Sequence, residues 1–151
     1  MRPNSLIELD RDHLIHPVIS WKGHEARGAT VLQSAQGATL TDAEGHTLLD
    51  GFSGLWCVNV GYGHESIVEV AAEQMRRLPY ATGYFHFSSE PAIRLAARLA
   101  ELAPGDLNHV YFTLGGSDAV DSAVRFIRYY YNVTGRPTKK HMIALERGYH
   151  G

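Results

Sequence analysis

The residues with the clearest capacity for chemistry are Gly115-Gly116-Ser117, which stand between a predicted buried strand (110–114) and a predicted helix (about 118–133). Two glycines let the backbone approach a ligand closely, and the first N–H groups of a helix have no partner within it. Such a turn can bind an anion, to which Ser117 adds a hydroxyl. The alternative is an ordinary strand-to-helix turn capped by Ser117 or Asp118. The local pattern favours neither interpretation.

Two common nucleotide-binding motifs are absent from this turn. A Walker loop requires a lysine followed by serine or threonine after its glycines, and the turn contains no lysine. A dinucleotide-binding turn requires the spacing Gly-x-Gly-x-x-Gly, and the third glycine is missing. If the turn binds a phosphate, that phosphate therefore belongs to a molecule smaller than a nucleotide.

A second predicted strand (142–145) follows the long helix, so the segment has the order strand, helix, strand. This order is typical of a parallel sheet, in which ligands bind beyond the carboxyl ends of the strands. Tyr149 and His150 follow the second strand, and we expect them at the same sheet edge as Gly115-Gly116-Ser117. An aromatic ring there can stack on a flat heteroaromatic cofactor, although a plain surface turn is the alternative.

The elements before this unit are of several kinds. Residues 1–30 lack a clear period and predict an irregular arm, whereas residues 31–49 predict a small antiparallel unit whose turn is Asp42-Ala43-Glu44-Gly45. Apolar spacing predicts helices over 65–78 and from Ser89, as N-cap, to Leu102. We therefore divide the chain into residues 1–50, the arm with the antiparallel unit, and residues 51–151, the start of a larger domain.

Two loops rich in aromatic residues separate these elements, at 50–63 and 80–87. Trp56, Tyr84 and Phe85 are large enough to line an apolar substrate pocket. Each one taken singly is better explained as a core residue. Cys57, the only cysteine, is expected to be a small buried hydrophobe rather than a nucleophile.

Composition excludes several classes of function. The 151 residues are 44% hydrophobic and carry a formal net charge of -2, which is ordinary for a globular protein and offers no basic surplus for nucleic acid or an anionic membrane. The lone cysteine excludes an internal disulfide, and the first residues lack a secretory pattern, so we expect a cytoplasmic protein. Of nine histidines, His13 and His16 stand three apart without a supporting carboxylate or cysteine cluster, and we expect no metal site.

Motifs in fixed order carry a resemblance to a known family: Leu49-Asp50-Gly51 with Gly54-Leu55-Trp56, then residues 103–110, then residues 116–121, and finally residues 148–151. Together they resemble the class III pyridoxal-phosphate aminotransferases, above all the omega-amino acid and amine:pyruvate branch. The resemblance extends from about Trp21 to the last residue. Asp118 departs from the glutamate that is usual in the family, and Gly115 replaces a more polar residue.

The resemblance implies an α/β protein of fold type I, with this chain supplying the N-terminal segment and the first part of the mainly parallel-sheet large domain. It implies that Gly116 and Ser117 hold the phosphate of pyridoxal 5'-phosphate, and that Tyr149 stacks on the ring beside His150. It further implies that Trp56, Tyr84 and Phe85 contact the substrate. The implied assembly is a homodimer whose active site lies between the subunits, acting on small amines and keto acids.

The resemblance also implies that the catalytic groups lie outside this chain. The family uses a Schiff-base lysine, and Lys22, Lys139 and Lys140 match no motif that contains it. Because the chain stops directly after a predicted strand, we expect it to be a truncated portion that is inactive alone. Three functions stay open: part of an aminotransferase, a fragment that binds cofactor without chemistry, or a truncated partner of a full-length subunit.

Overall fold

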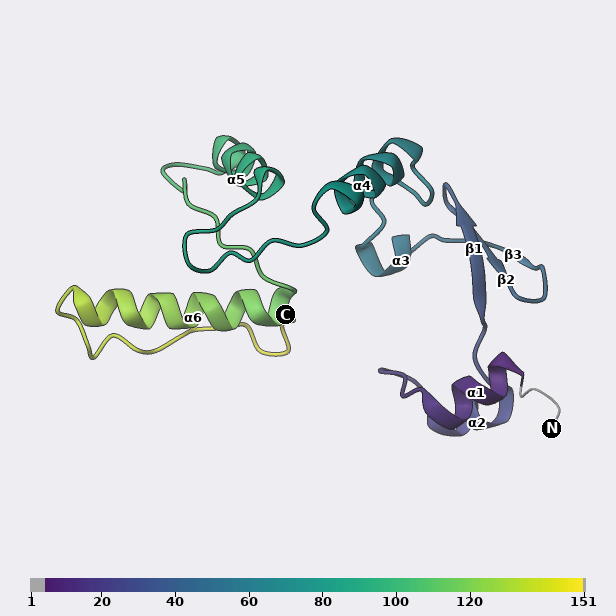
Figure 1. Cartoon of the computed structure of the whole chain (residues 1–151). Helices are drawn as coiled ribbons and strands as arrows, with labels where there is room; N and C mark the ends of the chain where they lie inside the picture. Colours follow the sequence, from purple (N-terminus) through teal and green to yellow (C-terminus); the bar gives the residue numbers. More distant parts are fainter. Residues whose placement is uncertain (1–4, 151) are drawn as a thin grey trace. The chain divides into compact units, whose positions relative to one another are not determined.

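The computed structural model describes residues 5–150 and forms two units, residues 1–80 and residues 81–151 (Figure 1). The first unit contains a three-stranded sheet and several helices. Its elements are α1 (Leu6–His13), α2 (Trp21–Arg27), β1 (Leu32–Gln36), β2 (Thr39–Asp42), β3 (Thr47–Leu49), α3 (Ser53–Trp56) and α4 (Glu65–Arg77). The second unit contains α5 (Glu90–Leu102) and α6 (Gly116–Val133). The division expected near residue 50 stays a prediction.

The prediction of an irregular arm is wrong over residues 5–30, because α1 and α2 lie there. The cause of α1 is a capping box: Ser5 accepts a hydrogen bond from the N–H of Glu8, and the Glu8 carboxylate accepts one from the N–H of Ser5. The hydroxyl of Ser20 accepts a hydrogen bond from the N–H of Gly23 and caps α2. Serine caps stabilise helices that are too short to show a clear apolar period.

The antiparallel unit predicted over residues 31–49 is confirmed. The strand order is β1-β2-β3, with β2 antiparallel to both neighbours, and the register pairs Gln36 with Thr39 and Thr39 with Leu49. Gly45 takes the expected positive φ of 87°. The Asp42 carboxylate accepts hydrogen bonds from the N–H groups of Glu44 and His46, at 2.9 and 2.8 Å, and so closes the turn.

The helices predicted in the rest of the chain are confirmed with small shifts at their ends. α4 and α5 lie within one residue of the expected bounds, and Pro91 stands in the first turn of α5. Ser89 occupies the N-cap position, but its side chain makes no capping hydrogen bond. α6 begins at Gly116, two residues earlier than predicted.

The two strands predicted at 110–114 and 142–145 are not formed within residues 5–150. A strand exists only through hydrogen bonds to a neighbouring strand, and neither segment finds one among the described residues. Apart from the half-buried Val110, their apolar side chains are exposed, and Leu114 and Ile143 are fully so. The prediction of these two strands is therefore wrong within residues 5–150.

Little of the described chain is buried. No apolar side chain among residues 5–150 is classed as buried, and the two buried residues are His24 and Asp42. Cys57 is exposed, so the expectation of a buried thiol is wrong. No helix of residues 5–150 is long and apolar enough to cross a membrane.

Candidate cofactor and substrate site

The first turn of α6 presents the Gly115-Gly116-Ser117 turn to solvent. Gly115 is the N-cap residue in extended backbone conformation, and no side chain makes a capping hydrogen bond to this end of the helix. The sequence alternative, in which Ser117 or Asp118 caps the helix, is therefore wrong. All residues from 115 to 118 are exposed.

This donor set fits a phosphate. The N–H groups of the first turn have no acceptor within the helix, and the helix dipole favours a negative charge there. Ser117 adds a hydroxyl for which no hydrogen-bond partner is found in residues 5–150. A Cβ atom at Gly115 would meet nothing within 4 Å, so the approach to the turn is open. Asp118 is the one opposing group, because its carboxylate stands in the same turn.

The segment after α6 carries Tyr149 and His150. Tyr149 is 92% exposed, so its ring is free to stack on a ligand. A ring nitrogen of His150, Nε2, lies 3.4 Å from the carbonyl oxygen of Leu145, which folds the end of the described chain into a turn. In Figure 1 the chain after α6 turns back along the helix, towards the end where α6 begins. Gly151 lies outside the described residues.

The loop 50–63 is organised by one carboxylate, that of Asp50. It accepts hydrogen bonds from the N–H of Phe52 at 3.0 Å and the N–H of Gly54 at 2.8 Å. The hydroxyl of Tyr62 donates a third, also at 2.8 Å. Asp50 therefore joins the two ends of the loop that contains Trp56.

The pKa values of Asp50 and Tyr62 follow from this contact. The hydrogen bond from the Tyr62 hydroxyl, helped by the N–H groups of the loop, lowers the pKa of Asp50 below its ordinary value. The same hydrogen bond, together with desolvation, raises the pKa of Tyr62. At neutral pH the carboxylate is thus charged and the phenol neutral, which is the state that this contact requires.

Within the loop, α3 is a left-handed turn. Its four residues have positive φ angles: 49° at Ser53, 56° at Gly54, 65° at Leu55 and 64° at Trp56. Only Gly54 adopts this conformation without a steric penalty, and for the others the left-handed region costs about 1–2 kcal/mol per residue. Backbone strain of this kind persists only where the surroundings enforce it, and it clusters at functional sites.

The aromatic residues expected at the substrate lie on the surface of their units. Trp56 is 76% exposed and stands edge-on to Phe52, with ring centroids 6.0 Å apart. Tyr84 and Phe85 are 74% and 84% exposed, with ring centroids 6.1 Å apart. The interpretation of these three residues as core is therefore wrong within the described chain.

The site residues predicted from the sequence fall in both units. Gly116, Ser117, Tyr149 and His150 belong to residues 81–151, as do Tyr84 and Phe85, whereas Trp56 belongs to residues 1–80. Sequence reasoning used Asp50 only as part of a motif and missed its structural role, as it missed that of Tyr62. An aspartate followed by glycine at a strand end is a turn signal, and it could have identified the first of the two.

Comparisons with known proteins identify the family of this chain. The model of the family "Aminotransferase class-III" matches residues 22–151. This chain belongs to the class III aminotransferases. A putrescine–pyruvate aminotransferase from Pseudomonas aeruginosa is 43% identical over 143 residues, which are 95% of this chain and 31% of that protein. The cofactor of the family is pyridoxal 5'-phosphate.

Solved structures show the same fold. An (S)-enantioselective omega-transaminase from Thermomicrobium roseum superposes with a TM-score of 0.93 at 40% identity, over 97% of this chain and 33% of that one. An omega transaminase from Pseudomonas jessenii in complex with PMP gives a TM-score of 0.94 at 32% identity, over 98% of this chain and 33% of that one. The expected class, α/β of fold type I, is thereby confirmed. The chain spans about a third of the length of these relatives.

Proposed function

We propose that this chain is the N-terminal part of an enzyme that transfers an amino group from an amine or omega-amino acid to a keto acid such as pyruvate. The observation that carries the proposal is the uncapped first turn of α6, with Ser117 exposed in it, in a chain that belongs to the class III aminotransferases. The names of the similar proteins, which include amine and omega-amino acid transaminases acting on pyruvate, support the choice of substrates.

In this proposal the first turn of α6 binds the phosphate of pyridoxal 5'-phosphate. The N–H groups of Gly116 and Ser117 and the Ser117 hydroxyl donate hydrogen bonds to it, and the helix dipole adds a favourable field. Tyr149 covers one face of the cofactor ring, with His150 beside it. When bound, the cofactor supplies an electron sink for the carbon from which the amino group leaves.

Trp56, Tyr84 and Phe85 form apolar walls of the substrate pocket in the same proposal. Their exposure leaves large aromatic faces available for such contacts. The left-handed turn, which Asp50 fixes, sets the direction of Trp56. We further propose that the assembled enzyme is a cytoplasmic homodimer, in which loop 80–87 reaches the site of the other subunit. No residue of this chain is assigned as the lysine that the family uses.

A binding titration tests the cofactor assignment. We expect Ser117→Ala to weaken binding of pyridoxal 5'-phosphate, followed by absorbance, by about tenfold, because a hydrogen bond to a charged group is lost. Ser122→Ala is the matched control, since Ser122 lies on α6 beyond its first turn. Equal affinity of Ser117→Ala and the control for the cofactor would show that Ser117 in the first turn of α6 does not bind the phosphate.

An activity assay tests the reaction. The whole protein is given putrescine or β-alanine with pyruvate, and alanine formation is measured. Turnover supports the proposal, and cofactor binding without turnover of any amine favours the alternative of a binding fragment. For the 151-residue chain alone we expect no alanine, because the family's lysine has no counterpart among Lys22, Lys139 and Lys140.

A further inference from the structure

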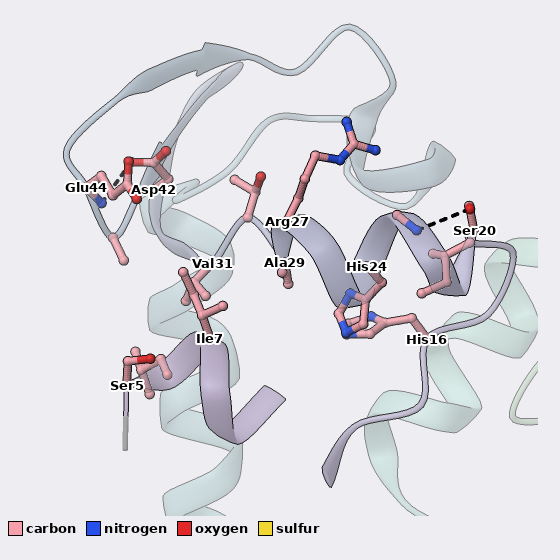
Figure 2. A pocket seen from close by; sticks show the side chains of 16 residues that line it. Ser5, Ile7, His16, Ser20, His24, Arg27, Ala29, Val31, Asp42 and Glu44 are labelled. Carbon is pink, nitrogen blue, oxygen red and sulfur yellow. Dashed lines mark hydrogen bonds between the residues drawn. The ribbon is translucent and has the colours of Figure 1, made fainter. Parts of the chain in front are cut away.

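Three polar side chains from separate parts of the N-terminal segment meet at one point. Asp10 lies on α1, His16 lies between the helices, and His24 lies on α2. The Nε2 atom of His16 is 2.8 Å from Oδ1 of Asp10, and the Nε2 atom of His24 is 3.4 Å from Oδ2 of the same carboxylate. Figure 2 shows the rings of His16 and His24 next to each other, with centroids 4.9 Å apart.

The cluster is partly buried, and two of its polar atoms lack a hydrogen-bond partner. His24 is 8% exposed, and the side chain of Asp10 is 13% exposed. Nε2 of His24 and Oδ2 of Asp10 are both buried, and neither has a hydrogen-bond partner within residues 5–150. Buried polar atoms nearly always have a partner, since leaving one without costs about 1–3 kcal/mol. Nε2 of His24 and Oδ2 of Asp10 lie 3.4 Å apart as an ion pair without a hydrogen bond, so a cation that both atoms ligate would satisfy them.

We propose that Asp10, His16 and His24 bind a divalent first-row transition metal ion such as Zn²⁺. Each residue offers one ligating atom, and these atoms all lie within 4.8 Å of one another. Ligating atoms in a tetrahedral zinc site lie about 2.1 Å from the ion, and so roughly 3.4 Å from one another. Nε2 of His24 already lies at this distance from Oδ2 of Asp10, whereas Nε2 of His16 has to exchange its hydrogen bond to Oδ1 for the ion.

The chemistry of the ligands decides the class of ion. Two imidazoles and one carboxylate suit Zn²⁺, Co²⁺ or Ni²⁺, while the absence of a thiolate disfavours Cu⁺. A water molecule completes the fourth position, as in zinc sites with three protein ligands. Arg27 lines the same pocket, but its side chain extends away from the two rings (Figure 2). Its charge therefore does not occupy the place of the ion.

A metal site in this segment was not expected from the sequence. His13 and His16 stand close in sequence without a cluster, but the fold pairs His16 with Asp10 and adds His24 instead. His13 is exposed on α1 and takes no part. A bound ion would join α1 to α2 and hold the intervening residues, independently of any aminotransferase activity.

The test is a titration of the full chain, produced without a histidine tag and treated with a chelator, with Co²⁺ as the probe. We expect visible absorption bands that saturate at one ion per chain and disappear when Zn²⁺ is added. Asp10→Asn, which keeps the shape of the side chain, should weaken Co²⁺ binding by about tenfold or more. His13→Ala is the matched control and should bind as the unaltered chain does.

Three outcomes would overturn the proposal: absence of saturable bands, unchanged binding by Asp10→Asn, or an equal loss in His13→Ala. The first would mean that Asp10 is shared between two histidines without an ion. Far-UV circular dichroism shows whether Asp10→Asn keeps its helices. If it does not, His16→Ala decides in the same way, because the His16 side chain is 28% exposed and tolerates replacement better.

Discussion

The loop 50–63 and the segments that flank α6 contrast sharply in how their backbones are satisfied. In the loop, Asp50 accepts three hydrogen bonds from residues at most twelve positions away, and the N–H of Trp56 donates to the carbonyl of Phe52. In segments 110–114 and 142–145, no strand ladder forms within residues 5–150, and the apolar side chains face solvent. The loop carries Trp56 of the proposed site, and the two segments precede its residues Ser117 and Tyr149 in the chain.

This difference shows which parts of a site can form through contacts between residues that are close in sequence. A carboxylate and a few N–H groups close a loop through contacts at short sequence separation, at a small cost in chain entropy. A parallel strand requires neighbours from distant parts of a chain, because each crossover takes a dozen or more residues. The direction of Trp56 is thus fixed within the loop, whereas segments 110–114 and 142–145 form no sheet edge among residues 5–150.

The largest expected effect is a difference in amide exchange between the two regions. We expect the N–H groups of Gly54 and Trp56 to exchange about a hundredfold more slowly than those of Tyr111 and Phe112, because only the first two have acceptors in the described chain. Hydrogen–deuterium exchange of the 151-residue chain, corrected for intrinsic rates, measures this. Similar protection in both regions would show that the loop and the segments that flank α6 do not differ in backbone hydrogen bonding.

A methyl group at Gly54 should disturb the loop strongly. Gly54 has φ of 56°, and an added Cβ would lie 2.8 Å from the Tyr62 hydroxyl oxygen. We expect Gly54→Ala to lower the free energy of unfolding by about 1–2 kcal/mol through backbone strain alone. Gly51→Ala is the matched control, since a Cβ there meets nothing within 4 Å. Urea unfolding compares the two, and equal loss would show that the left-handed turn is unimportant.

Removing the charge of Asp50 should loosen the loop without changing its steric fit. We expect Asp50→Asn to speed exchange of the Gly54 N–H by about tenfold, since an amide is a weaker acceptor than a carboxylate. Asp12→Asn on α1 is the control, because Asp12 is exposed. An unchanged exchange rate would mean that the backbone alone holds the turn.

The smallest effect concerns pH at the β2–β3 turn, another locally closed site. The hydrogen bond with the Asp42 carboxylate raises the pKa of His46. Burial raises the pKa of Asp42, but hydrogen bonds from His46 and Glu44 outweigh it and leave the pKa lowered. His46 therefore stabilises the turn fully below its ordinary pKa of about 6.5 and loses this as pH rises through the raised value.

For Asp42 the sign is opposite. Its contribution is present above the ordinary carboxyl pKa of about 3.9 and is lost as pH falls through the lowered value. An NMR titration of the His46 ring checks the pair: Asp42→Asn should lower the pKa of His46, and Asp12→Asn should leave it unchanged. A His46 pKa that is the same in both variants would show that the contact with Asp42 is not maintained in solution.

Much of the local structure was predictable. Helical spacing identified α4, α5 and α6, and the Asp42-to-Gly45 turn identified the β2–β3 hairpin, because both signals depend on neighbours within one or two turns. The capping box of Ser5 and Glu8 was also legible in the sequence, although the arm was predicted to be irregular. The left-handed turn was not predictable, since Ser53, Leu55 and Trp56 have no preference for positive φ.

The sequence by itself determined the family, the helices α4, α5 and α6, the hairpin and the chemical character of the turn before α6, all of which rest on short-range patterns or ordered motifs. Only the tertiary structure decided that the helix N-terminus is uncapped, that Asp50 ties the loop of Trp56, and that Asp10 meets His16 and His24. The residues in these contacts are not spaced at the period of a helix or a strand, so the sequence pattern does not reveal them. Chain folding in space, rather than propensity, brings their polar atoms within reach.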